Sequence, residues 1–414
     1  MKFRSRIPAP VGEVFAWHER PGAITRLSPP WVPVRVVKES TSLRDGEAVF
    51  GLPGGVHFTS RHDPSGYEAG VRFVDTMPGW RHTHGFLPDG DDATVIEDHL
   101  QTAVPEALVR AMFAYRHRQL AADLAAQARW GGPKVTVAMT GSSGLVGTAL
   151  RALLTTAGHE VVRLVRRAPA APDERQWAPS QPDPKALDGT DVVVHLAGAP
   201  ILGRFTTAHK QRLVSSRVAP TRLLAAAAGE RPFISASAIG YYGPQALGDG
   251  PKEKGTGFLA DLVAEWEETG AKGRAVQVRT GIALSPLGGL LGLTYPVFLA
   301  GLGGRIGDGQ QWMSWIALDD LVDIYFRAIF DEGLRGPVDA VAPVPVTNQT
   351  FTRTLAHVLH RPSLLSVPIE VTRLLLGEGS TEFVEASQKI EPLAGHTFRY
   401  PELEPALRHM LGRA

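Results

Sequence analysis

The sequence predicts an α/β protein with a doubly wound parallel sheet, preceded by a smaller α+β domain. From Lys134 onward, strand-like and helix-like segments alternate, which is typical of a parallel sheet covered by helices. Before Trp130, strand-like runs follow one another and a long helical pattern closes the series. The length of 414 residues also favours two or three domains. We predict domains at residues 1–131, 134–345 and 346–414.

The N-terminal domain is predicted to contain a strand, a helix, a series of strands and a final helix. The first strand covers Lys2–Ile7, and the first helix lies around Val11–His18. The strand-like runs that follow read VPVRVV, EAVFGL, GVHFTSRH, YEAGVRFVD, WRHTHGFL and DATVIEDHL. A long helix begins after Pro105, and a Gly-Gly-Pro sequence at 131–133 ends the domain.

This order of elements, together with the stretch WHERPGAITRLSPPW, resembles the helix-grip fold of the START-like ligand-binding superfamily. In that fold, the sheet and the long helix enclose an apolar cavity. The resemblance implies that the N-terminal domain binds an apolar ligand.

A strand, a glycine-rich turn and a helix follow one another in the stretch VTVAMTGSSGLVGTALRALL. The apolar strand Val135–Met139 is followed by Gly141, Gly144 and Gly147. In such a unit the first glycine permits a tight turn, the second lets the backbone approach a pyrophosphate, and the third lets the helix lie close to its strand. The helix N-terminus directs free N–H groups and a positive dipole end at the phosphates. The stretch therefore predicts a dinucleotide-binding Rossmann unit.

The second strand of this unit indicates which dinucleotide binds. His159–Val165 reads as that strand, and Arg166 and Arg167 follow it with no carboxylate before Asp173. A site for NAD usually has Asp or Glu here to bind the ribose 2′-hydroxyl, whereas guanidinium groups suit the 2′-phosphate of NADP. The alternative is that both arginines are solvated surface residues. We predict that the cofactor is NADP(H).

The motifs along the rest of the chain resemble one family. In order they read TGSSGLVG, HLAGAPI, SSRVAPTRLL, ISASAIGYYG, FLADLVAEWEE, VRTGIALSPLGG and WMSWIALDDLV. They are similar to an atypical, epimerase-like branch of the extended short-chain dehydrogenases/reductases, of the nucleoside-diphosphate-sugar epimerase type. The resemblance spans Val135 to about Met410 and implies a small C-terminal substrate lobe. Some members carry an N-terminal START-like domain.

The resemblance implies a set of cofactor-binding residues at the carboxyl ends of the strands. Arg217 stands where many extended members have an Asn that reaches towards the active site. The implied residues are Gly141, Ser142, Gly144, Leu145, Val146, Arg166, Arg167, His195, Leu196, Ala197, Gly198, Arg217, Ser235, Ala236, Arg279 and Thr280.

The catalytic residues differ from those of typical members. The wider superfamily uses a Tyr-x-x-x-Lys pair on the helix after the fifth strand, but the resemblance places Leu259 and Val263 there, and neither can transfer a proton. We predict that Ser237, with Tyr241 or Tyr242, supplies the catalytic hydroxyls instead. The alternatives are a capping role for the serine and aromatic packing for the tyrosines.

Two functions agree with these features. The first is an NADP(H)-dependent oxidoreductase or epimerase-like enzyme that acts on a small polar or sugar-like substrate and carries an apolar-ligand-binding domain. The alternative is a non-catalytic NADP(H)-binding protein that senses redox state or a ligand. The missing Tyr-x-x-x-Lys pair favours the sensor, and the intact phosphate loop and substrate lobe favour the enzyme.

Composition excludes several other classes. The 43 basic and 42 acidic residues give a formal net charge of +1, so charge gives no reason to expect nucleic acid or an anionic membrane as a partner. The absence of cysteine excludes disulfides and thiol nucleophiles and agrees with a cytoplasmic location. Gly281–Gly304 carries no charge and is long enough to span a bilayer, but its prolines and glycines predict a buried active-site loop instead.

Four histidines of the N-terminal domain fall on neighbouring strand-like runs. His82 and His84 alternate and so share one face, and His57 and His62 lie on another run. Imidazole is a common metal ligand, but the sequence offers no third ligand at a convincing spacing. We therefore predict no metal site.

Overall fold

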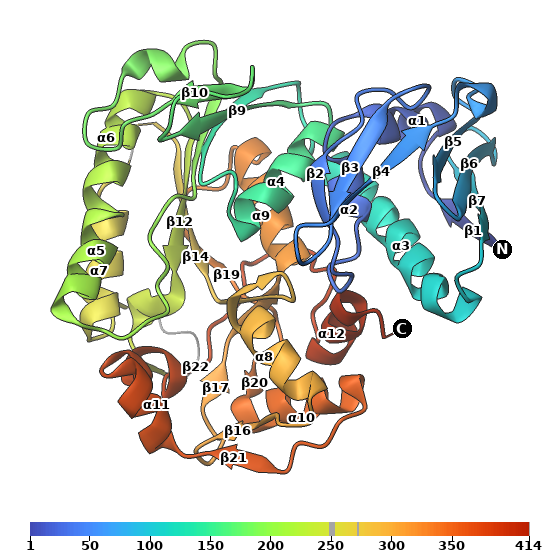
Figure 1. Ribbon diagram of the computed structural model, residues 1–414. Coiled ribbons are helices and arrows are strands. Elements are labelled where there is room, and N and C mark those ends of the chain that lie inside the picture. The colour runs from blue at the N-terminus through green and yellow to red at the C-terminus, as the bar shows by residue number, and fades with distance from the viewer. Residues whose placement is uncertain (248–252, 271–272, 414) are drawn as a thin grey trace. The chain divides into compact units, whose positions relative to one another are not determined.

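The computed structural model describes residues 1–247, 253–270 and 273–413. Its contacts divide the chain into two compact units, and Figure 1 labels most of their elements. Unit 1 contains Met1–Lys134, Ala149–His159 and His409–Ala414, and unit 2 contains Val135–Thr148 and Glu160–Arg408. The domain boundaries drawn from the sequence stay a prediction.

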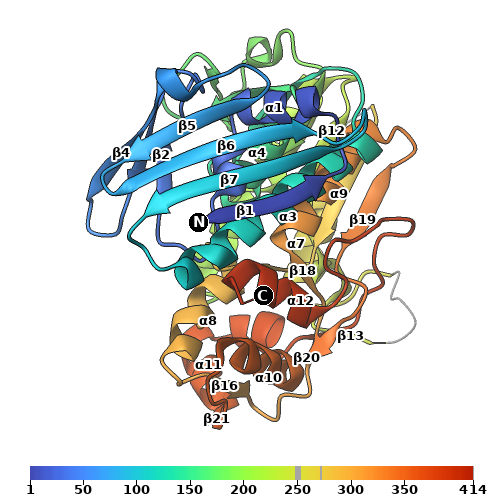
Figure 2. The same cartoon turned by 90° about the vertical axis from the view of Figure 1, so that its right-hand side faces the viewer.

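Unit 1 is built on a seven-stranded antiparallel sheet in the order β1-β7-β6-β5-β4-β3-β2. Its strands are β1 (Lys2–Ile7), β2 (Arg35–Lys38), β3 (Glu47–Gly51), β4 (His57–His62), β5 (Arg72–Met77), β6 (Trp80–Pro88) and β7 (Thr94–Thr102). Figure 2 shows β1, β7, β6 and β5 side by side. Each strand-like run predicted in this part of the chain overlaps one of these strands, and several of the strands extend one or two residues beyond the run.

A long helix packs against this sheet. The helices of unit 1 include α1 (Val11–Glu19), α2 (Ala23–Leu27) and α3 (Glu106–Trp130). The buried apolar side chains of α3 include Val109, Phe113, Leu120 and Leu124, whose spacing follows the helical period, so one face of the helix is turned to the core. The ring of Phe113 stacks on that of Phe3 in β1, with the ring centroids 4.3 Å apart.

A buried ion pair joins α2 to α3. Arg26 donates two hydrogen bonds of 2.7 Å to the carboxylate of Asp123, and Gln119 donates a third of 2.9 Å. The side chain of Asp123 is fully buried, and that of Arg26 is 5% exposed. The carboxylate therefore depends on these donors for the hydrogen bonds that water would otherwise supply.

Replacing Asp123 by Ala should leave the Arg26 guanidinium buried without its counter-ion. We expect the free energy of unfolding of unit 1 to fall by about 3–5 kcal/mol, measured by urea denaturation followed by circular dichroism. The matched control is Glu106→Ala, which removes an exposed ion pair with Arg110 on the same helix. In the control, the free energy of unfolding should fall by less than about 0.5 kcal/mol. Equal losses in the two variants would contradict the prediction.

Unit 2 contains a seven-stranded parallel sheet in the order β10-β9-β8-β11-β12-β14-β19, which confirms the predicted Rossmann-like sheet. Its strands are β8 (Thr136–Thr140), β9 (Glu160–Val165), β10 (Glu174–Gln176), β11 (Val192–His195), β12 (Phe233–Ala238), β14 (Ala275–Thr280) and β19 (Gly336–Ala340). The connections run through α4 (Leu145–Thr156), α5 (Thr207–Ser215), α6 (Val218–Ala228), α7 (Phe258–Glu267) and α9 (Leu318–Phe330). The strand order reverses between β8 and β11, and such sheets bind ligands outside the carboxyl ends of the strands at this reversal.

The remaining elements of unit 2 form what we call the small lobe. Its two-stranded pairings are β13 (Gln245–Ala246) with β22 (Ser387–Gln388), β15 (Ile282–Ser285) with β18 (Trp315–Ala317), β16 (Gly304–Ile306) with β21 (Leu365–Val367), and β17 (Trp312–Met313) with β20 (Val346–Thr347). Its helices include α8 (Gly289–Leu299), α10 (Asn348–Leu359) and α11 (Ile369–Leu376), with a π-helical turn at Ser380–Val384. Helix α12 (Leu403–Leu411) begins in unit 2, and its last residues belong to unit 1. The pairings join segments that are far apart in the sequence.

The uncharged segment Gly281–Gly304 does not form a buried loop, although several of its residues, among them Ile282 and Leu290, line a cavity in unit 2. It contains strand β15 and helix α8, and several of its leucines are exposed, among them Leu293 at 60%. The prediction was wrong because Pro286 precedes the helix, and Pro296 is accommodated inside it. Among the described residues, no helix is both long enough and apolar enough to span a membrane.

Candidate cofactor and substrate site

The glycine-rich turn after β8 leaves no room for a side chain at Gly141 or at Gly147. Gly141 has a φ of +67°, and a Cβ atom there would lie 2.7 Å from the carbonyl carbon of Leu196. A Cβ atom at Gly147 would lie 2.2 Å from the carbonyl oxygen of Gly141. At Gly144 the nearest atom would be that same oxygen, at 3.3 Å, so space is open in front of this residue. Helix α4 begins at Leu145, and its free N–H groups face this space as a phosphate site requires.

A threonine holds the glycine turn against the end of β11. The hydroxyl oxygen of Thr140 accepts hydrogen bonds from the N–H groups of Leu196 (3.2 Å) and Ala197 (3.3 Å). The same oxygen lies 2.6 Å from Nδ1 of His195. Burial, together with the positive charge of Arg217, lowers the pKa of His195 to about 4, so its imidazole is neutral near pH 7. The predicted segment His195–Gly198 therefore lies beside the phosphate loop.

The two predicted 2′-phosphate residues have different surroundings. Arg167 makes a two-pronged ion pair with Glu174, with N–O distances of 2.6 and 2.7 Å. The hydrogen bonds from Arg167 are the main reason that the pKa of Glu174 is lowered to about 2. Arg166 is exposed and makes no hydrogen bond or ion pair with any residue that the structure describes. Arg166 is therefore available to a ligand, whereas Arg167 is already paired.

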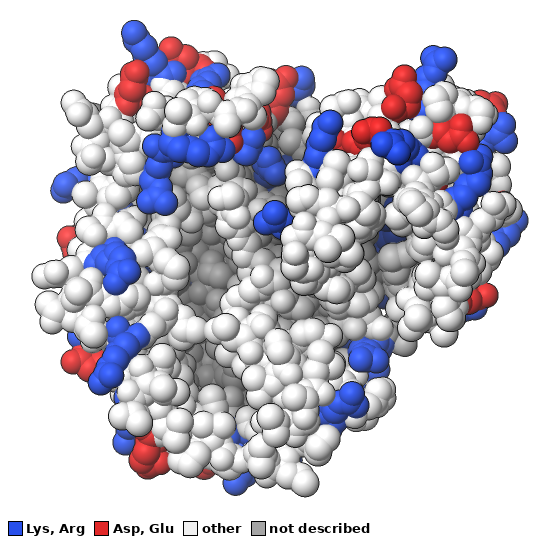
Figure 3. Space-filling model, in the orientation of Figure 1, with Lys and Arg blue, Asp and Glu red and all other residues white. Residues whose placement is uncertain are grey.

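A cavity of about 420 Å³ lies in unit 2, between the phosphate loop and the small lobe. Its wall includes Leu145 of the phosphate loop, Thr280 at the end of β14, and Leu259 and Val263 of α7. The last two are the residues that the resemblance places at the superfamily's Tyr and Lys positions, and both side chains are apolar. On the face shown in Figure 3, unit 2 is hollowed, and Lys and Arg side chains gather at the upper edge of the hollow.

The positively charged side chain of Arg217 lies in the cavity wall. Its side chain is 5% exposed, donates to the carbonyl oxygen of Ala199 (2.8 Å) and to Ser216 Oγ (3.2 Å), and lies 5.3 Å from the ring of Trp266. Its Nε has no hydrogen-bond partner, and no carboxylate of the described residues is bonded to it. Burial lowers the pKa of Arg217 to about 10, which still leaves it charged. A buried guanidinium in this state suits an anionic group of a ligand.

The predicted catalytic hydroxyls of Ser237 and Tyr242 belong to one polar network. Ser237 Oγ donates to the Glu267 carboxylate (2.6 Å), to which Arg279 also donates two hydrogen bonds of 2.8 and 2.6 Å. Arg279 donates to the Tyr242 hydroxyl (2.9 Å), which donates in turn to Asp339 (2.8 Å). Burial and the charge of Asp339 raise the pKa of Tyr242 above its usual value. The network thus supplies partners for these hydroxyls without a substrate.

The predicted site residues therefore fall into two groups. Tyr241 adds its ring to the network, because the Arg279 guanidinium lies 3.6 Å from the ring centroid. None of the network residues is among the described residues that line the cavity. Of the predicted cofactor residues, Leu145, Arg217 and Thr280 line it. A catalytic role for Ser237 and the two tyrosines stays a prediction.

Glu382 is a cavity residue that the sequence analysis did not identify. It lies on the π-helical turn, and its carboxylate accepts a hydrogen bond from the backbone N–H of Phe258, at the start of α7 (3.0 Å). Burial raises the pKa of this carboxyl group. No local motif marks Glu382, because only the fold brings it beside a helix whose first residue is 124 positions earlier.

The parallel sheet, the glycine turn and the adjoining cavity define a dinucleotide-binding protein. Residues 137–259 match the NAD dependent epimerase/dehydratase family, and residues 367–410 match a domain of unknown function. An epimerase family protein of Mycobacterium bovis is 42% identical over 296 residues, which cover 67% of this chain and 98% of that protein. Another from Bacillus subtilis is 35% identical, over 67% of this chain and 98% of that protein. The chain belongs to this epimerase family.

Two solved structures are similar to this chain. A nucleoside-diphosphate sugar epimerase from Corynebacterium glutamicum is 40% identical, with a TM-score of 0.83, and the match covers 100% of this chain and 90% of that one. The human epimerase family protein SDR39U1, solved with NADPH, is 30% identical, with a TM-score of 0.60. That match covers 67% of this chain and 99% of the human chain. The similarity to the Corynebacterium protein therefore extends through unit 1 as well.

Replacing Gly147 by Ala should weaken dinucleotide binding. The added methyl would collide with the Gly141 carbonyl, and relief of such overpacking costs about 1–3 kcal/mol, or roughly five- to a hundredfold in affinity. Fluorescence titration with NADPH and NADH measures the change. The control is Gly12→Ala, whose methyl would meet no atom within 4 Å and should leave affinity unchanged. Native affinity in Gly147→Ala would show that the turn does not bind the cofactor.

Proposed function

We propose that this protein is an NADP(H)-dependent oxidoreductase or epimerase-like enzyme that acts on a small polar or sugar-like substrate. The observation that carries the proposal is the cavity that runs from the phosphate loop, at Leu145, to the buried guanidinium of Arg217. Two similar proteins support it, since one is described as a nucleoside-diphosphate sugar epimerase and the other was solved with NADPH.

The residues present fit NADP(H). Gly141, Gly144 and Gly147 form a turn that leaves room for a pyrophosphate, and the start of α4 supplies N–H donors. The unpaired Arg166 would bind the 2′-phosphate, whereas Arg167 keeps Glu174 from competing for the ribose. When bound, NADP(H) supplies or accepts a hydride.

Arg217 would hold the substrate through an anionic group. Its guanidinium is buried beside Trp266 and keeps an unused N–H at Nε. A charge-assisted hydrogen bond from such a donor is stronger than one between neutral groups, and burial protects it from screening. An anionic substituent, such as the diphosphate of an activated sugar, would give the substrate one fixed orientation in the otherwise largely apolar cavity.

Glu382 is the group that we propose to handle the proton. Its carboxyl faces the cavity, and burial holds its pKa above the usual value, so it retains a proton to a higher pH than an exposed glutamate. It can therefore donate a proton to a substrate oxygen and later take one back. The rate of the step in which it acts as an acid should fall as the pH rises through its raised pKa.

A second candidate function is a non-catalytic NADP(H)-binding sensor. The specific observation in its favour is that Leu259 and Val263 present apolar side chains where the superfamily has its proton-transferring pair. In that case the cofactor would bind without turnover, and ligand binding by the remaining part of the protein would depend on it.

We also propose that unit 1 is a START-like domain that binds an apolar ligand. The order of the antiparallel sheet, the long helix α3 and a cavity of about 330 Å³ within unit 1 support this. Apolar side chains of the cavity wall include Leu27, Phe50, Phe58, Phe73 and Met112.

Native protein should bind NADPH more tightly than NADH, and Arg166→Asp should remove the difference. A hydrogen bond to a charged group contributes about 1.5–3 kcal/mol, so we expect NADPH affinity to fall roughly ten- to a hundredfold while NADH affinity changes little. The control is Arg222→Asp, which changes an exposed arginine on α6. Titration of both cofactors measures the outcome. Equal native affinities for NADPH and NADH would overturn the assignment.

Glu382→Gln should lower turnover by about two to four orders of magnitude while cofactor affinity stays native, because Gln still accepts the Phe258 N–H but cannot transfer the proton. The substrate is first found by screening metabolite extracts for NADPH oxidation. The control Glu385→Gln changes a carboxylate that lies just after the same turn and pairs with Arg373. Ser237→Ala and Tyr242→Phe test the residues predicted from the sequence. Native turnover in Glu382→Gln would exclude it as the proton carrier.

A further inference from the structure

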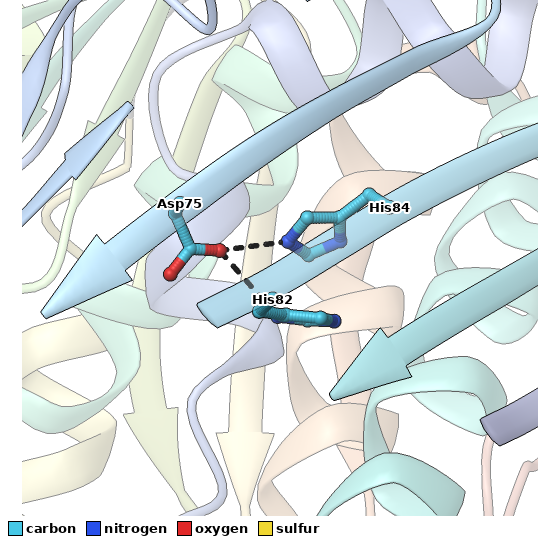
Figure 4. Close-up of side chains that lie close together, drawn as sticks. All are labelled: Asp75, His82 and His84. Atoms are coloured by element: carbon cyan, nitrogen blue, oxygen red, sulfur yellow. Dashed lines mark hydrogen bonds and ion pairs between the residues drawn. The ribbon is translucent and has the colours of Figure 1, made fainter. Parts of the chain in front are cut away.

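Asp75, His82 and His84 lie together in the wall of the unit 1 cavity. His82 and His84 lie on β6, and Asp75 lies on the neighbouring strand β5, directly opposite His82 in the antiparallel pairing. Side chains at alternate positions of a strand share a face, so all three point to the same side of the sheet. Figure 4 shows the Asp75 carboxylate turned towards both imidazole rings. Both histidines are buried, at 4% exposure each.

The ligand atoms of these three residues have the spacing of a metal site. Asp75 Oδ2 lies 3.0 Å from Nε2 of His84 and 3.4 Å from Nδ1 of His82. Ligand atoms bound at about 2.0–2.2 Å around a tetrahedral metal ion are separated by roughly 3.3 Å. One atom from each residue lies within 4.8 Å of the others.

Asp98 determines which ring nitrogen of His82 and of His84 is available to bind a metal ion. It lies on β7, directly opposite His84, and its Oδ1 is 2.9 Å from Nε2 of His82 and 3.1 Å from Nδ1 of His84. Its other oxygen is 2.6 Å from Nε2 of His117. A carboxylate that accepts the second N–H of an imidazole is the usual support of a metal-binding histidine.

Neutral imidazoles alone do not satisfy this arrangement. All four ring nitrogens of His82 and His84 face a carboxylate oxygen, but a neutral imidazole carries one N–H. With the N–H groups directed at Asp98, two lone pairs face the negative charge of Asp75. A cation between them removes that repulsion. It is either one proton on each ring or a metal ion bound by all three residues.

We propose that Asp75, His82 and His84 bind a divalent transition-metal ion whose remaining coordination position opens into the unit 1 cavity. Two histidines and one carboxylate are a ligand set that zinc and non-haem iron both accept, with room for a water or a ligand. The charge also fits. The two negative charges of Asp75 and Asp98 are balanced by the two positive charges of one dication, while both imidazoles stay neutral.

The open coordination position of the metal ion would determine which ligand binds in the unit 1 cavity. Arg116 also lines the cavity, and it makes no hydrogen bond or ion pair with the described residues. A metal ion and a guanidinium in a cavity that is otherwise lined largely by aromatic and aliphatic side chains suit an apolar molecule with one anionic oxygen group, such as a carboxylate. This deepens the proposed apolar-ligand function of unit 1 and is independent of the enzyme activity proposed for unit 2.

The test uses Co²⁺ as the probe and the full chain, after metal has been removed with a chelator and by dialysis. We expect one equivalent of Co²⁺ per chain by equilibrium dialysis, with the visible absorption of a site that has nitrogen and oxygen ligands. His84→Ala and the nearly isosteric Asp75→Asn should weaken binding more than about a hundredfold, since even supporting residues cost ten- to a hundredfold. Asp98→Asn, which changes a supporting residue, should weaken Co²⁺ binding by about ten- to a hundredfold.

The matched control is His62→Ala, which removes a histidine that lines the same cavity but bonds to the Ser42 carbonyl instead. It should bind Co²⁺ as the native protein does. Circular dichroism and cooperative thermal unfolding establish that each variant is folded. The proposal is overturned if the native chain takes up no stoichiometric Co²⁺, which leaves protonated histidines as the cation, or if folded Asp75→Asn binds with native affinity. If apolar molecules that carry one carboxylate group bind equally with and without Co²⁺ in the site, the ligand assignment is overturned.

Discussion

The close approach of Gly141 to the chain after β11 is the constraint on which the site of unit 2 depends. β8 and β11 are adjacent parallel strands, but their connections leave in opposite directions, so their carboxyl ends must meet without a side chain between them. A Cβ atom at Gly141 would lie 2.7 Å from the Leu196 carbonyl carbon, and Thr140 bonds the two ends together. The cavity depends on this junction, because Leu145 enters its wall directly after the turn.

Features that depend on neighbouring residues could be predicted from the sequence, and features that depend on distant ones could not. The glycine turn and the alternating strands are local, so the parallel sheet followed from them. The hydrogen-bond network around Arg279 could not be predicted from the sequence, because it joins Glu267 of α7 to Asp339 of β19 across the sheet. The hydroxyl of Ser237 could be placed on the correct strand, but its direction towards Glu267 depends on that packing.

Strand register explains why the sequence did not indicate the cluster of Asp75, His82 and His84 in unit 1. The alternation of His82 and His84 is visible in the sequence and places them on one face. The third residue, Asp75, is opposite His82 only because the β5–β6 hairpin has this particular register. A shift of one residue would turn Asp75 to the other face of the sheet. No regular spacing along the sequence connects Asp75 to the two histidines, because cross-strand pairing brings the three residues together.

Arg217 has a practical consequence for any study of this protein. A buried positive charge without a bonded carboxylate raises the free energy of the folded chain, and any anion that reaches it lowers that free energy again. Phosphate, sulfate and citrate offer the required charge. Thermal stability should therefore vary with the buffer anion, and a buffer that stabilises the protein would at the same time act as a competitor in a search for its substrate.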